Sequence, residues 1–373
     1  MRRIIFSLLF SIIVLDTIGQ EILTAKNNMY RPDDELTKKQ ILYKELGRSG
    51  QNVLWNLGEI ETIDDSYSVI YSDRNLRIGT ISGTEHKTRY YYELRNDSLL
   101  ISGFENNTTL IVNNLPEVAL RFPMQYGDSI DGVFHGKGIY CDKFRLRMFG
   151  TYKNKIDAIG MLIIPGEDTL RHVIRVCSDR KIANITYPLD SCELDNANYD
   201  FGEDSIRYYI STNLPLIQMR TYTWYAAGYR YPVLETTTIT EAGSDIYTSS
   251  FYCPQEEQSH LAYDYDNQLV REELIRHGGN SYDSTSGDMG FTYNIYQVGS
   301  SNQLKFEYEL KKSAGFSYGI YGIDGTAYYY QPEIQQSCGV YSCVIDLGSN
   351  PTGIYILDMH VGDRQYTEKL IIR

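Results

Sequence analysis

The sequence predicts an all-β protein, in which a larger N-terminal antiparallel β-sandwich is followed by a small C-terminal Ig-like β-sandwich. Tyrosine supplies 34 of the 373 residues, and tyrosine favours strands because its ring covers a half-buried face while its hydroxyl stays in water. Short strand-like segments recur at regular spacing with turn clusters between them and no helical crossovers, which is typical of sandwiches. A chain of this length exceeds one hydrophobic core, so about two domains are expected.

Residues 1–19 have the layout of a secretory signal peptide. Two arginines form a basic start, residues 4–15 are apolar, and a small-residue cleavage site, Thr17-x-Gly19, precedes Gln20. The apolar run is too short to span a bilayer, and no later stretch is long enough. We therefore expect an exported chain without a transmembrane segment, located in the periplasm, at the cell surface or outside the cell.

Residues 20–245 are predicted to form the larger sandwich. The first stretch, residues 33–45, has helical spacing, with Leu36 and Ile41 roughly on one side. Two glycines then break this pattern, and a strand carrying Trp55 begins. The strands expected after it are SYSVIYS, TRYYYELR, SLLISGFE, TTLIVN, KIDAIGMLIIP, TLRHVIRVC, SIRYYIST and the Tyr-rich pair QMRTYTWYAAGYRYPVLETTT.

Residues 246–289 interrupt the strand pattern and are predicted to be a linker. The segment is polar and turn-rich, with a possible short helix over residues 267–277. The alternative is a long loop packed on the first domain, because Phe251, Tyr252 and Leu261 are apolar and need cover.

Residues 290–373 return to a regular strand pattern. Between residues 304 and 310, apolar residues alternate with lysine and glutamate, as in a strand buried on one face. An Asp324-Gly325 pair predicts a hairpin turn, and two more strands close the chain around a Gly-Asp turn. About seven strands of this kind predict a small Ig-like sandwich, with the last strand in its core.

Four motifs resemble, in the same order, a group of exported proteins from Bacteroidetes: GRSGQNVLWNL, RFPMQYGDSIDGVF, IDAIGMLIIPGEDTLRHVIRV and YTWYAAGYRYPVLE. The C-terminal unit, from LKFEYELKKSAGFSYGIYGIDGTAYYY to GIYILDMHVGDRQYTEKLIIR, looks like the C-terminal sorting domain of the type IX (Por) secretion system. The resemblance covers nearly the whole chain after the signal peptide. It implies the type IX export machinery as a partner and brings no catalytic residues. Whether the tail is a removable address or a permanent core strand stays open at this point.

The triplet Asp-Ser/Thr-apolar looks like the acceptor for O-linked glycans in the same phylum. The four acceptor candidates are Ser98, Ser129, Thr169 and Ser205. The competing interpretation is ordinary turn chemistry, since serine after aspartate is common in turns.

The net charge of −13 at pH 7 bears on the choice of partner. It argues against nucleic acid and anionic membrane, because both need a basic face. A glycan or another envelope protein is compatible with this charge.

Six cysteines in an exported chain permit disulfides. Cys338 and Cys343 are close enough to bridge a hairpin corner, but Cys343 shares a strand face with Tyr341 and Ile345, so a free buried thiol fits equally well. No CxxC pair occurs and the histidines are scattered, so neither a structural zinc site nor another cofactor is predicted.

The segment LDNANYDFGED collects oxygen ligands suited to a hard cation. Its candidate ligands are Asp195, Asn196, Asn198 and Asp200. The EF-hand rhythm is broken, however, because Ile206 stands where the bidentate glutamate belongs. A solvated acidic turn is therefore the favoured interpretation, with calcium as the alternative.

The tyrosine surplus suggests a carbohydrate-binding surface, with Trp224, Tyr225, Tyr229 and Tyr231 as the first candidate patch. The competing and favoured interpretation is that these rings cover sheet edges and pack across strands.

Catalytic motifs are absent from the sequence. There is no GxSxG and no HExxH, and the separation of Cys253 from His260 does not predict a thiol–imidazole pair. A glycosidase needs two carboxylates across a cleft, and nothing in the sequence selects a pair. We therefore expect a non-enzymatic binding protein of the envelope, with a glycan-active hydrolase or a protein-only scaffold as alternatives.

Overall fold

The computed structural model describes residues 21–166, 169–189, 202–212, 216–276, 291–299, 301–348 and 352–372. The predicted signal peptide and the predicted calcium ligands lie outside these residues. Strands dominate the described chain, so the all-β class is confirmed. None of its helices is both long and apolar enough to cross a membrane.

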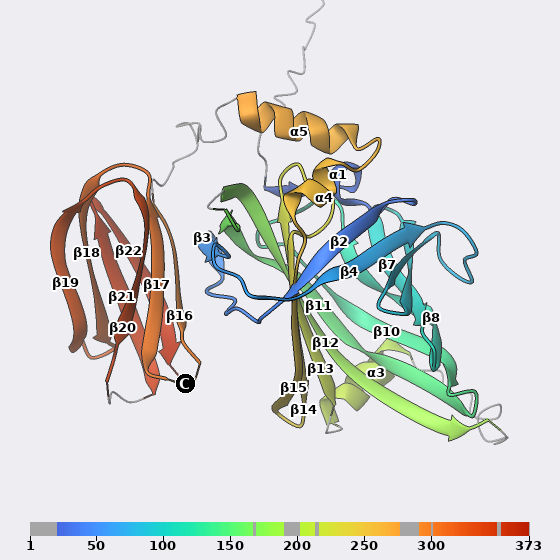
Figure 1. Ribbon diagram of the computed structural model, residues 1–373. Coiled ribbons are helices and arrows are strands. Elements are labelled where there is room, and N and C mark those ends of the chain that lie inside the picture. The colour runs from blue at the N-terminus through green and yellow to red at the C-terminus, as the bar shows by residue number, and fades with distance from the viewer. Residues whose placement is uncertain are drawn as a thin grey trace, which may run out of the picture.

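The larger unit is a closed twelve-stranded barrel (Figure 1). Its strands follow the order β10-β8-β7-β6-β5-β4-β2-β15-β14-β13-β12-β11, and β10 pairs with β11 along its whole length to close the ring. The expected N-terminal sandwich is therefore wrong. A closed sheet leaves no open edges, whereas two stacked sheets would leave four.

The barrel strands differ greatly in length. The longest are β11 and β12, with 20 residues each. The bounds are β2 Glu35–Ile41, β4 Thr62–Ser72, β5 Ile81–Glu85, β6 Thr88–Arg95, β7 Ser98–Glu105, β8 Thr109–Arg121, β10 Ser129–Tyr140, β11 Phe144–Ile163, β12 Thr169–Pro188, β13 Ile217–Ala226, β14 Leu234–Glu241 and β15 Ser244–Tyr252.

Two segments were assigned to the wrong class by their sequence pattern. The helical spacing in residues 33–45 is overridden, because β2 pairs with β4 on one side and β15 on the other. The segment SIRYYIST lies in helix α3, Glu203–Thr212. Its Ile206 and Ile210, four residues apart, are buried against Phe149 on the outside of the barrel.

The predicted linker is mostly part of the barrel unit. Its first residues belong to β15, and the short helix is confirmed as α5, Tyr265–Arg276. Together with α1, Ala25–Asn28, and α4, Gln255–Ser259, this helix lies over one end of the barrel (Figure 1). The short strands β1, Ile22–Leu23, and β9, Met124–Gln125, pair beside it.

The C-terminal unit has the seven strands expected of it. One sheet holds β16, β17 and β20, and the other has the order β19-β18-β21-β22. Aromatic and aliphatic side chains from both sheets form one buried cluster, which includes Leu370 and Ile372 of the last strand. The bounds are β16 Phe291–Gln297, β17 Gln303–Leu310, β18 Ala314–Gly322, β19 Ala327–Gln336, β20 Gly339–Asp346, β21 Gly353–Val361 and β22 Arg364–Ile372.

Strand β3, Gly50–Asn56, joins the two units. It pairs in parallel with β11 of the barrel and meets β16 at the pair Val53–Tyr293. Just before it, Arg48 stacks over the Tyr293 ring at 3.8 Å and lies 3.6 Å from the Glu368 carboxylate. The backbone amide of Arg48 also donates to Asn294 at 2.9 Å. The two units are therefore held together by a continuous sheet and a buried arginine.

Candidate functional site

The register of the strands identifies the face that lines the inside of the barrel. Residues directly opposite each other share a face, and one such row runs Ile156–Val176–Thr223–Glu235–Phe251 across five strands. Ile156 and Val176 belong to a buried cluster that also includes Leu99 of β7 and Ile111 of β8, and side chains from such distant strands of the ring can meet only on its inside. Glu235 and Phe251 therefore face the lumen.

Charged residues from two further strands reach the same lumen. Lys38 lies opposite Tyr67, and Glu85 lies opposite Val69. The Lys38 ammonium is 3.2 Å from the Glu85 carboxylate, so the lysine side chain crosses β4 on the inside of the wall. We name Lys38, Tyr67, Glu85, Glu235 and Phe251 the lumen site.

The lumen is not completely filled by side chains. Eight strands already leave room only for packed side chains, and wider barrels enclose a cavity. In agreement, the side chains of Lys38 and Glu85 are 12% and 21% exposed although they point inward. Tyr90, on the same face next to Gly83, is 36% exposed. Parts of the Lys38, Glu85 and Tyr90 side chains are therefore exposed on the inner face of the wall.

The two carboxylates of the lumen site have different surroundings. Glu85 is paired with Lys38, whereas the carboxylate of Glu235 makes no hydrogen bond or ion pair with any residue that the structure describes. Burial and the nearby Glu85 raise the pKa of Glu235, and Lys38 opposes this only in part. Burial lowers the pKa of Lys38, but the two glutamates outweigh it and the net pKa is raised. The lysine is thus firmly protonated.

Aromatic rings line the same region. The Tyr67 ring lies 4.4 Å from the rings of both Phe251 and His86, and its pKa is raised by burial and by Glu85. Further into the barrel, Tyr30 contacts Tyr71 and Tyr92 at 4.9 and 5.0 Å. The lumen therefore combines flat apolar faces with a few charged groups.

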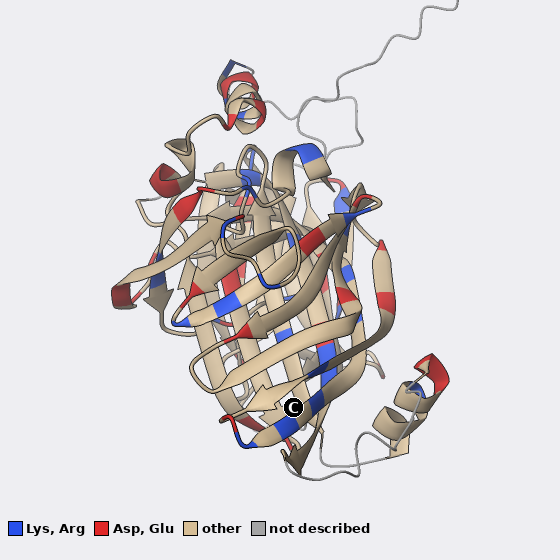
Figure 2. Ribbon diagram, turned by 90° about the vertical axis from the view of Figure 1, so that its right-hand side faces the viewer, with Lys and Arg blue, Asp and Glu red and all other residues tan. Residues whose placement is uncertain are grey.

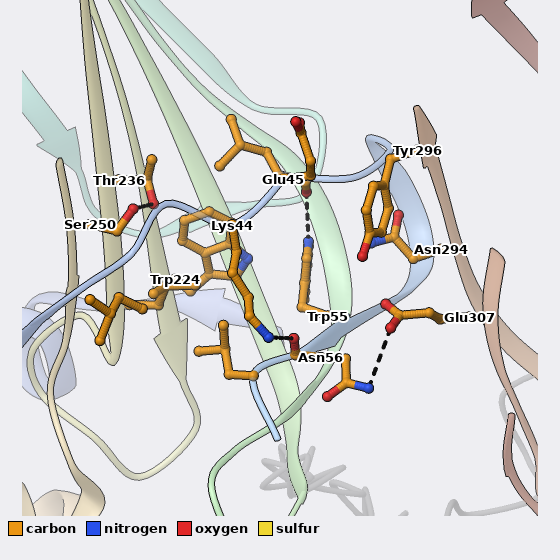
Figure 3. A pocket seen from close by; sticks show the side chains of 14 residues that line it. Lys44, Glu45, Trp55, Asn56, Trp224, Thr236, Ser250, Asn294, Tyr296 and Glu307 are labelled. Atoms are coloured by element: carbon orange, nitrogen blue, oxygen red, sulfur yellow. Dashed lines mark hydrogen bonds between the residues drawn. The ribbon is translucent and has the colours of Figure 1, made fainter. Parts of the chain in front are cut away.

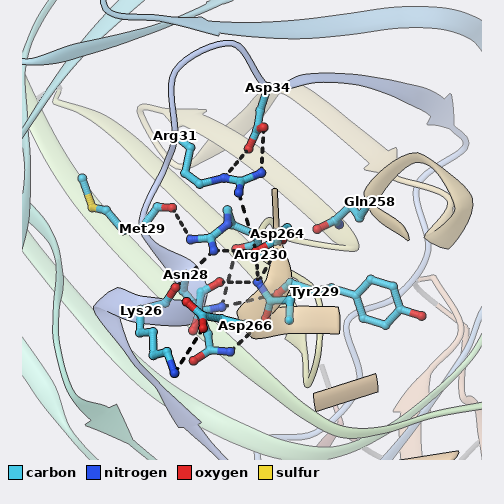
Figure 4. Close-up of polar contacts among 12 residues, drawn as sticks. Lys26, Asn28, Met29, Arg31, Asp34, Tyr229, Arg230, Gln258, Asp264 and Asp266 are labelled. Atoms are coloured by element: carbon cyan, nitrogen blue, oxygen red, sulfur yellow. Dashed lines mark hydrogen bonds and ion pairs between the residues drawn. The ribbon is translucent and has the colours of Figure 1, made fainter. Parts of the chain in front are cut away.

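A buried polar network closes one end of the barrel (Figure 4). Arg230 donates to Asp264 at 2.6 Å, and both side chains are almost fully buried. Arg230 also donates to the carbonyl of Met29 at 2.8 Å, which ties the N-terminal segment to the network. Arg31 pairs with Asp34, whose carboxylate also accepts from the Tyr231 hydroxyl. A buried pair with this many hydrogen bonds fixes the segment that carries Tyr30 across the barrel end.

A small cavity lies between the barrel and the C-terminal unit (Figure 3). Its volume is about 30 Å³, room for about two water molecules. Lys44 donates to the Asn56 carbonyl at 3.3 Å, and the Asn56 amide lies 3.4 Å from Glu307. Trp55 and Trp224 meet edge to face at its wall. A space of this size holds water rather than a ligand.

A larger hollow of about 300 Å³ lies outside the barrel, beside α4. It is lined by Lys39, Tyr252 and Glu256, with aliphatic and polar residues of the β4 and β11 ends. The lining places no pair of charged groups in contact, so we do not select it as the site.

The predicted aromatic patch does not form. Trp224, Tyr225, Tyr229 and Tyr231 are all at least 92% buried. Trp224 packs on the outside of the barrel under β3, while Tyr225 points into the lumen, since neighbours on a strand face opposite sides. The favoured interpretation, in which these rings pack across strands, describes their placement.

The other predicted positions are scattered. Of the acceptor candidates, Ser129 and Ser205 are exposed, Thr169 is half-buried and Ser98 is buried. Cys338 and Cys343 are free thiols here, and Cys343 lies 3.3 Å from the Tyr318 hydroxyl. Within the described ranges, no group of three or more His, Cys, Asp and Glu side chains could hold a metal ion.

Sequence reasoning missed the lumen site completely. Lys38 was assigned to a helix, and Glu85 and Glu235 belong to no motif. The sequence offers one signal. Lys38 comes two residues after Leu36, so in a strand both side chains face the same side. A sandwich core would hold a second apolar residue at that position, and not a lysine.

Comparisons with known proteins give little guidance. No family model matches the chain, and no curated protein matches it. A solved structure described as a polysaccharide lyase is similar over 91% of this chain, with 8% sequence identity and a TM-score of 0.18. This chain spans 40% of that protein's length. Such a likeness carries no argument about fold or function.

Proposed function

We propose that this protein is an exported binding protein of the cell envelope that holds a neutral carbohydrate in the barrel lumen. The observation that carries the proposal is the lumen site: Lys38 and Glu85 stay partly exposed on the inside of a closed barrel, beside aromatic rings. Ligand sites typically combine apolar and aromatic walls with a few placed polar groups.

The charges of the lumen favour a neutral ligand. Lys38 is paired with Glu85, and Arg180 is paired with Glu117 at 2.8 Å. The raised pKa of Glu235 favours its uncharged, hydrogen-bond-donating form. A sugar offers hydroxyls to these groups and an apolar ring face to Tyr67 and Phe251, so it matches both kinds of wall.

The polar network supports one direction of entry. Because Arg230, Asp264 and the segment around Tyr30 cover one end of the barrel, a ligand enters from the opposite end. A lumen with one covered end suits a chain terminus or a short oligosaccharide more than the middle of a long polymer.

Export and sorting belong to the same proposal. The basic and apolar pattern of residues 1–19 supports a signal peptide. The seven strands in two facing sheets support an Ig-like C-terminal module of the type IX sorting kind. The test is the mass of the C-terminal peptide of protein recovered from its own cells. A surface form lacking residues beyond the linker supports a removed address, and a form that ends in EKLIIR contradicts removal.

Binding is tested with the whole mature chain, residues 20–373, on an array of neutral oligosaccharides. Hits are then measured by calorimetry with Tyr67→Ala and with Tyr330→Ala, a matched control on an exposed strand face of the C-terminal unit. We expect at least a tenfold loss of affinity for the first and none for the second. Equal affinities for both would place the ligand elsewhere, and a blank array together with envelope-protein capture would support a protein-only scaffold.

A further inference from the structure

The hollow outside the barrel, beside α4, is large enough for a small molecule. Its volume is about 300 Å³, against about 30 Å³ for the cavity between the two units. Sites for small molecules begin at about the larger of these volumes. The walls come from β2, the chain around the start of β4, the chain just after β11, and the end of β15 with α4. The hollow therefore lies where several elements of the barrel unit meet.

Lys39 and Tyr252 line this hollow from neighbouring strands. They are register partners between β2 and β15, so their side chains share a face of the sheet. This is the outer face, since Lys38 and Phe251, the preceding residues, face the lumen. Lys39 has no register partner on β4, because the pairing of β2 with β4 shifts there. Irregular pairing of this kind is common beside functional sites.

Both side chains carry a polar group that lacks a protein partner. The Lys39 ammonium makes no hydrogen bond or ion pair with any residue that the structure describes. Tyr252 is 5% exposed, and within the described ranges its hydroxyl also forms no hydrogen bond. Leaving a buried hydroxyl unpaired costs free energy. A ligand in the hollow would give both groups a partner.

The hollow also holds a negative group, the carboxylate of Glu256 on α4. Burial is the first cause of the raised pKa of Tyr252, and the charge of Glu256 is the second. The Tyr252 hydroxyl therefore lies toward Glu256. Glu256 and Lys39 form no ion pair with each other or with another residue in the described part of the chain. Each can therefore contact a ligand.

The remaining walls are mostly apolar. Their aliphatic residues are Ile60, Ile164, Pro165 and Pro254. A short apolar chain would lie against these residues while charged groups at its other end reach Lys39 and Glu256. Since the lining holds one positive and one negative group, a ligand that carries both charges matches it better than a simple anion.

The wall that carries Glu256 is fixed by hydrogen bonds of α4. Gln258, 1% exposed, accepts from the Tyr231 amide at 2.8 Å and donates to the Tyr231 carbonyl at 3.0 Å. Gln255 accepts from the Tyr229 hydroxyl at 2.9 Å. These bonds hold the short helix against the barrel, so the hollow is preformed and a ligand loses little affinity to ordering of the wall.

We propose that this hollow binds a small zwitterion with an aliphatic side chain, such as a free aliphatic amino acid. Lys39 and Tyr252 hold the carboxylate, Glu256 holds the ammonium group, and the aliphatic walls take the side chain. This site goes beyond the proposed carbohydrate function and does not rest on it, because it uses the outer face of β2 and not the lumen.

The test is calorimetry of the mature chain, residues 20–373, with L-leucine as the probe. Two analogues each lack one charge: 4-methylpentanoate has no ammonium group, and 3-methylbutylamine has no carboxylate. We expect leucine to bind at least about tenfold more tightly than either analogue, because each analogue leaves one charged group of the hollow without a partner.

Three variants connect the binding to the hollow. Lys39→Met keeps the length of the side chain but removes its charge, and at least about a tenfold loss of leucine affinity is expected. Tyr252→Phe removes only the hydroxyl and should cost about fivefold. The matched control is Lys312→Met, an exposed lysine between β17 and β18, which should bind leucine as the wild type does. Circular dichroism checks that each variant is folded.

Three results would overturn the proposal. The first is no binding of leucine by the folded wild type. The second is equal affinity for leucine and 4-methylpentanoate, which contradicts the role of Glu256 and the zwitterion. The third is leucine affinity unchanged in both Lys39→Met and Tyr252→Phe, which places the ligand elsewhere. Carbohydrate binding in the lumen is measured separately with Tyr67→Ala, so either proposal can fail while the other stands.

Discussion

The barrel and the C-terminal unit are both built from antiparallel strands, yet they use their interiors differently. The C-terminal unit fills its interior with aromatic and aliphatic side chains such as Phe306 and Leu357, both fully buried. The barrel surrounds Lys38, Glu85 and Glu235, which keep contact with solvent space. The C-terminal unit is therefore close-packed with apolar side chains, whereas the inner face of the barrel also holds charged groups.

The sharpest test of this contrast compares one phenylalanine from each interior. Phe306→Ala leaves a cavity in a close-packed core, so it is expected to lower the free energy of unfolding by about 3–5 kcal/mol. Phe251→Ala removes a half-buried ring from a lumen that already has free space, and a loss of about 1–2 kcal/mol is expected. Urea unfolding followed by circular dichroism measures both. Equal losses would mean that the lumen is as tightly packed as the core.

The covered end of the barrel is expected to depend on one ion pair. Asp264→Ala leaves Arg230 buried without its carboxylate and should cost about 3–5 kcal/mol. The control is Asp266→Ala, since Asp266 forms an exposed pair with Lys26 and should cost less than about 1 kcal/mol. Urea unfolding followed by circular dichroism measures both losses. A small loss of stability in Asp264→Ala would show that the network does not hold the N-terminal segment.

A substitution at the junction between the two units is expected to lower the free energy of unfolding by an intermediate amount. Arg48→Ala removes the contacts to Tyr293 and Glu368 and should cost about 1–3 kcal/mol. Limited proteolysis should then cleave Arg48→Ala between residues 42 and 50 faster than it cleaves the wild type. The control is Arg74→Ala, which removes only an exposed surface pair and should be cleaved at the wild-type rate. Unchanged cleavage would show that the β3 pairing alone holds the units together.

The smallest expected effect is a pH dependence of stability. The pKa of Glu235 is raised in the folded state, so the unfolded state ionises first, near pH 4.3. Stability of the wild type should therefore fall relative to Glu235→Gln as pH rises from there through the folded-state pKa, and then stay constant. Thermal unfolding of both proteins across pH 4–8 measures this. If the unfolding temperatures of the wild type and of Glu235→Gln change in parallel with pH, the proposed burial of Glu235 is contradicted.

The two units also differ in how much the sequence revealed. Strands of the C-terminal unit alternate locally, with apolar residues at Leu304, Phe306 and Tyr308, so neighbouring residues suffice to predict them. Closure of the barrel depends on β10 pairing with β11 and β2 pairing with β15, and the second pairing joins residues about 200 positions apart. Local patterns carry no information about such pairings, so a sandwich and a barrel look alike in sequence.

The candidate site was hidden for the same reason. Lys38, Glu85 and Glu235 lie on β2, β5 and β14, and these strands come together only through the long-range pairing of β2 with β15. Helix α3 shows the complementary failure. Its Tyr208 and Tyr209 favour a strand, but Ile206 and Ile210 need helical spacing to cover the wall of a barrel that was not foreseen.

In Figure 2, acidic and basic residues are interspersed over the face shown.

The central claim is that the ligand lies inside the barrel, and a crystal structure of the mature chain with its tightest-binding oligosaccharide tests it most directly. The account predicts a sugar ring in contact with Tyr67 and Phe251, with hydroxyls within hydrogen-bond distance of Glu85 or Glu235. A sugar bound on the outer surface, with the lumen site holding only water, would contradict it.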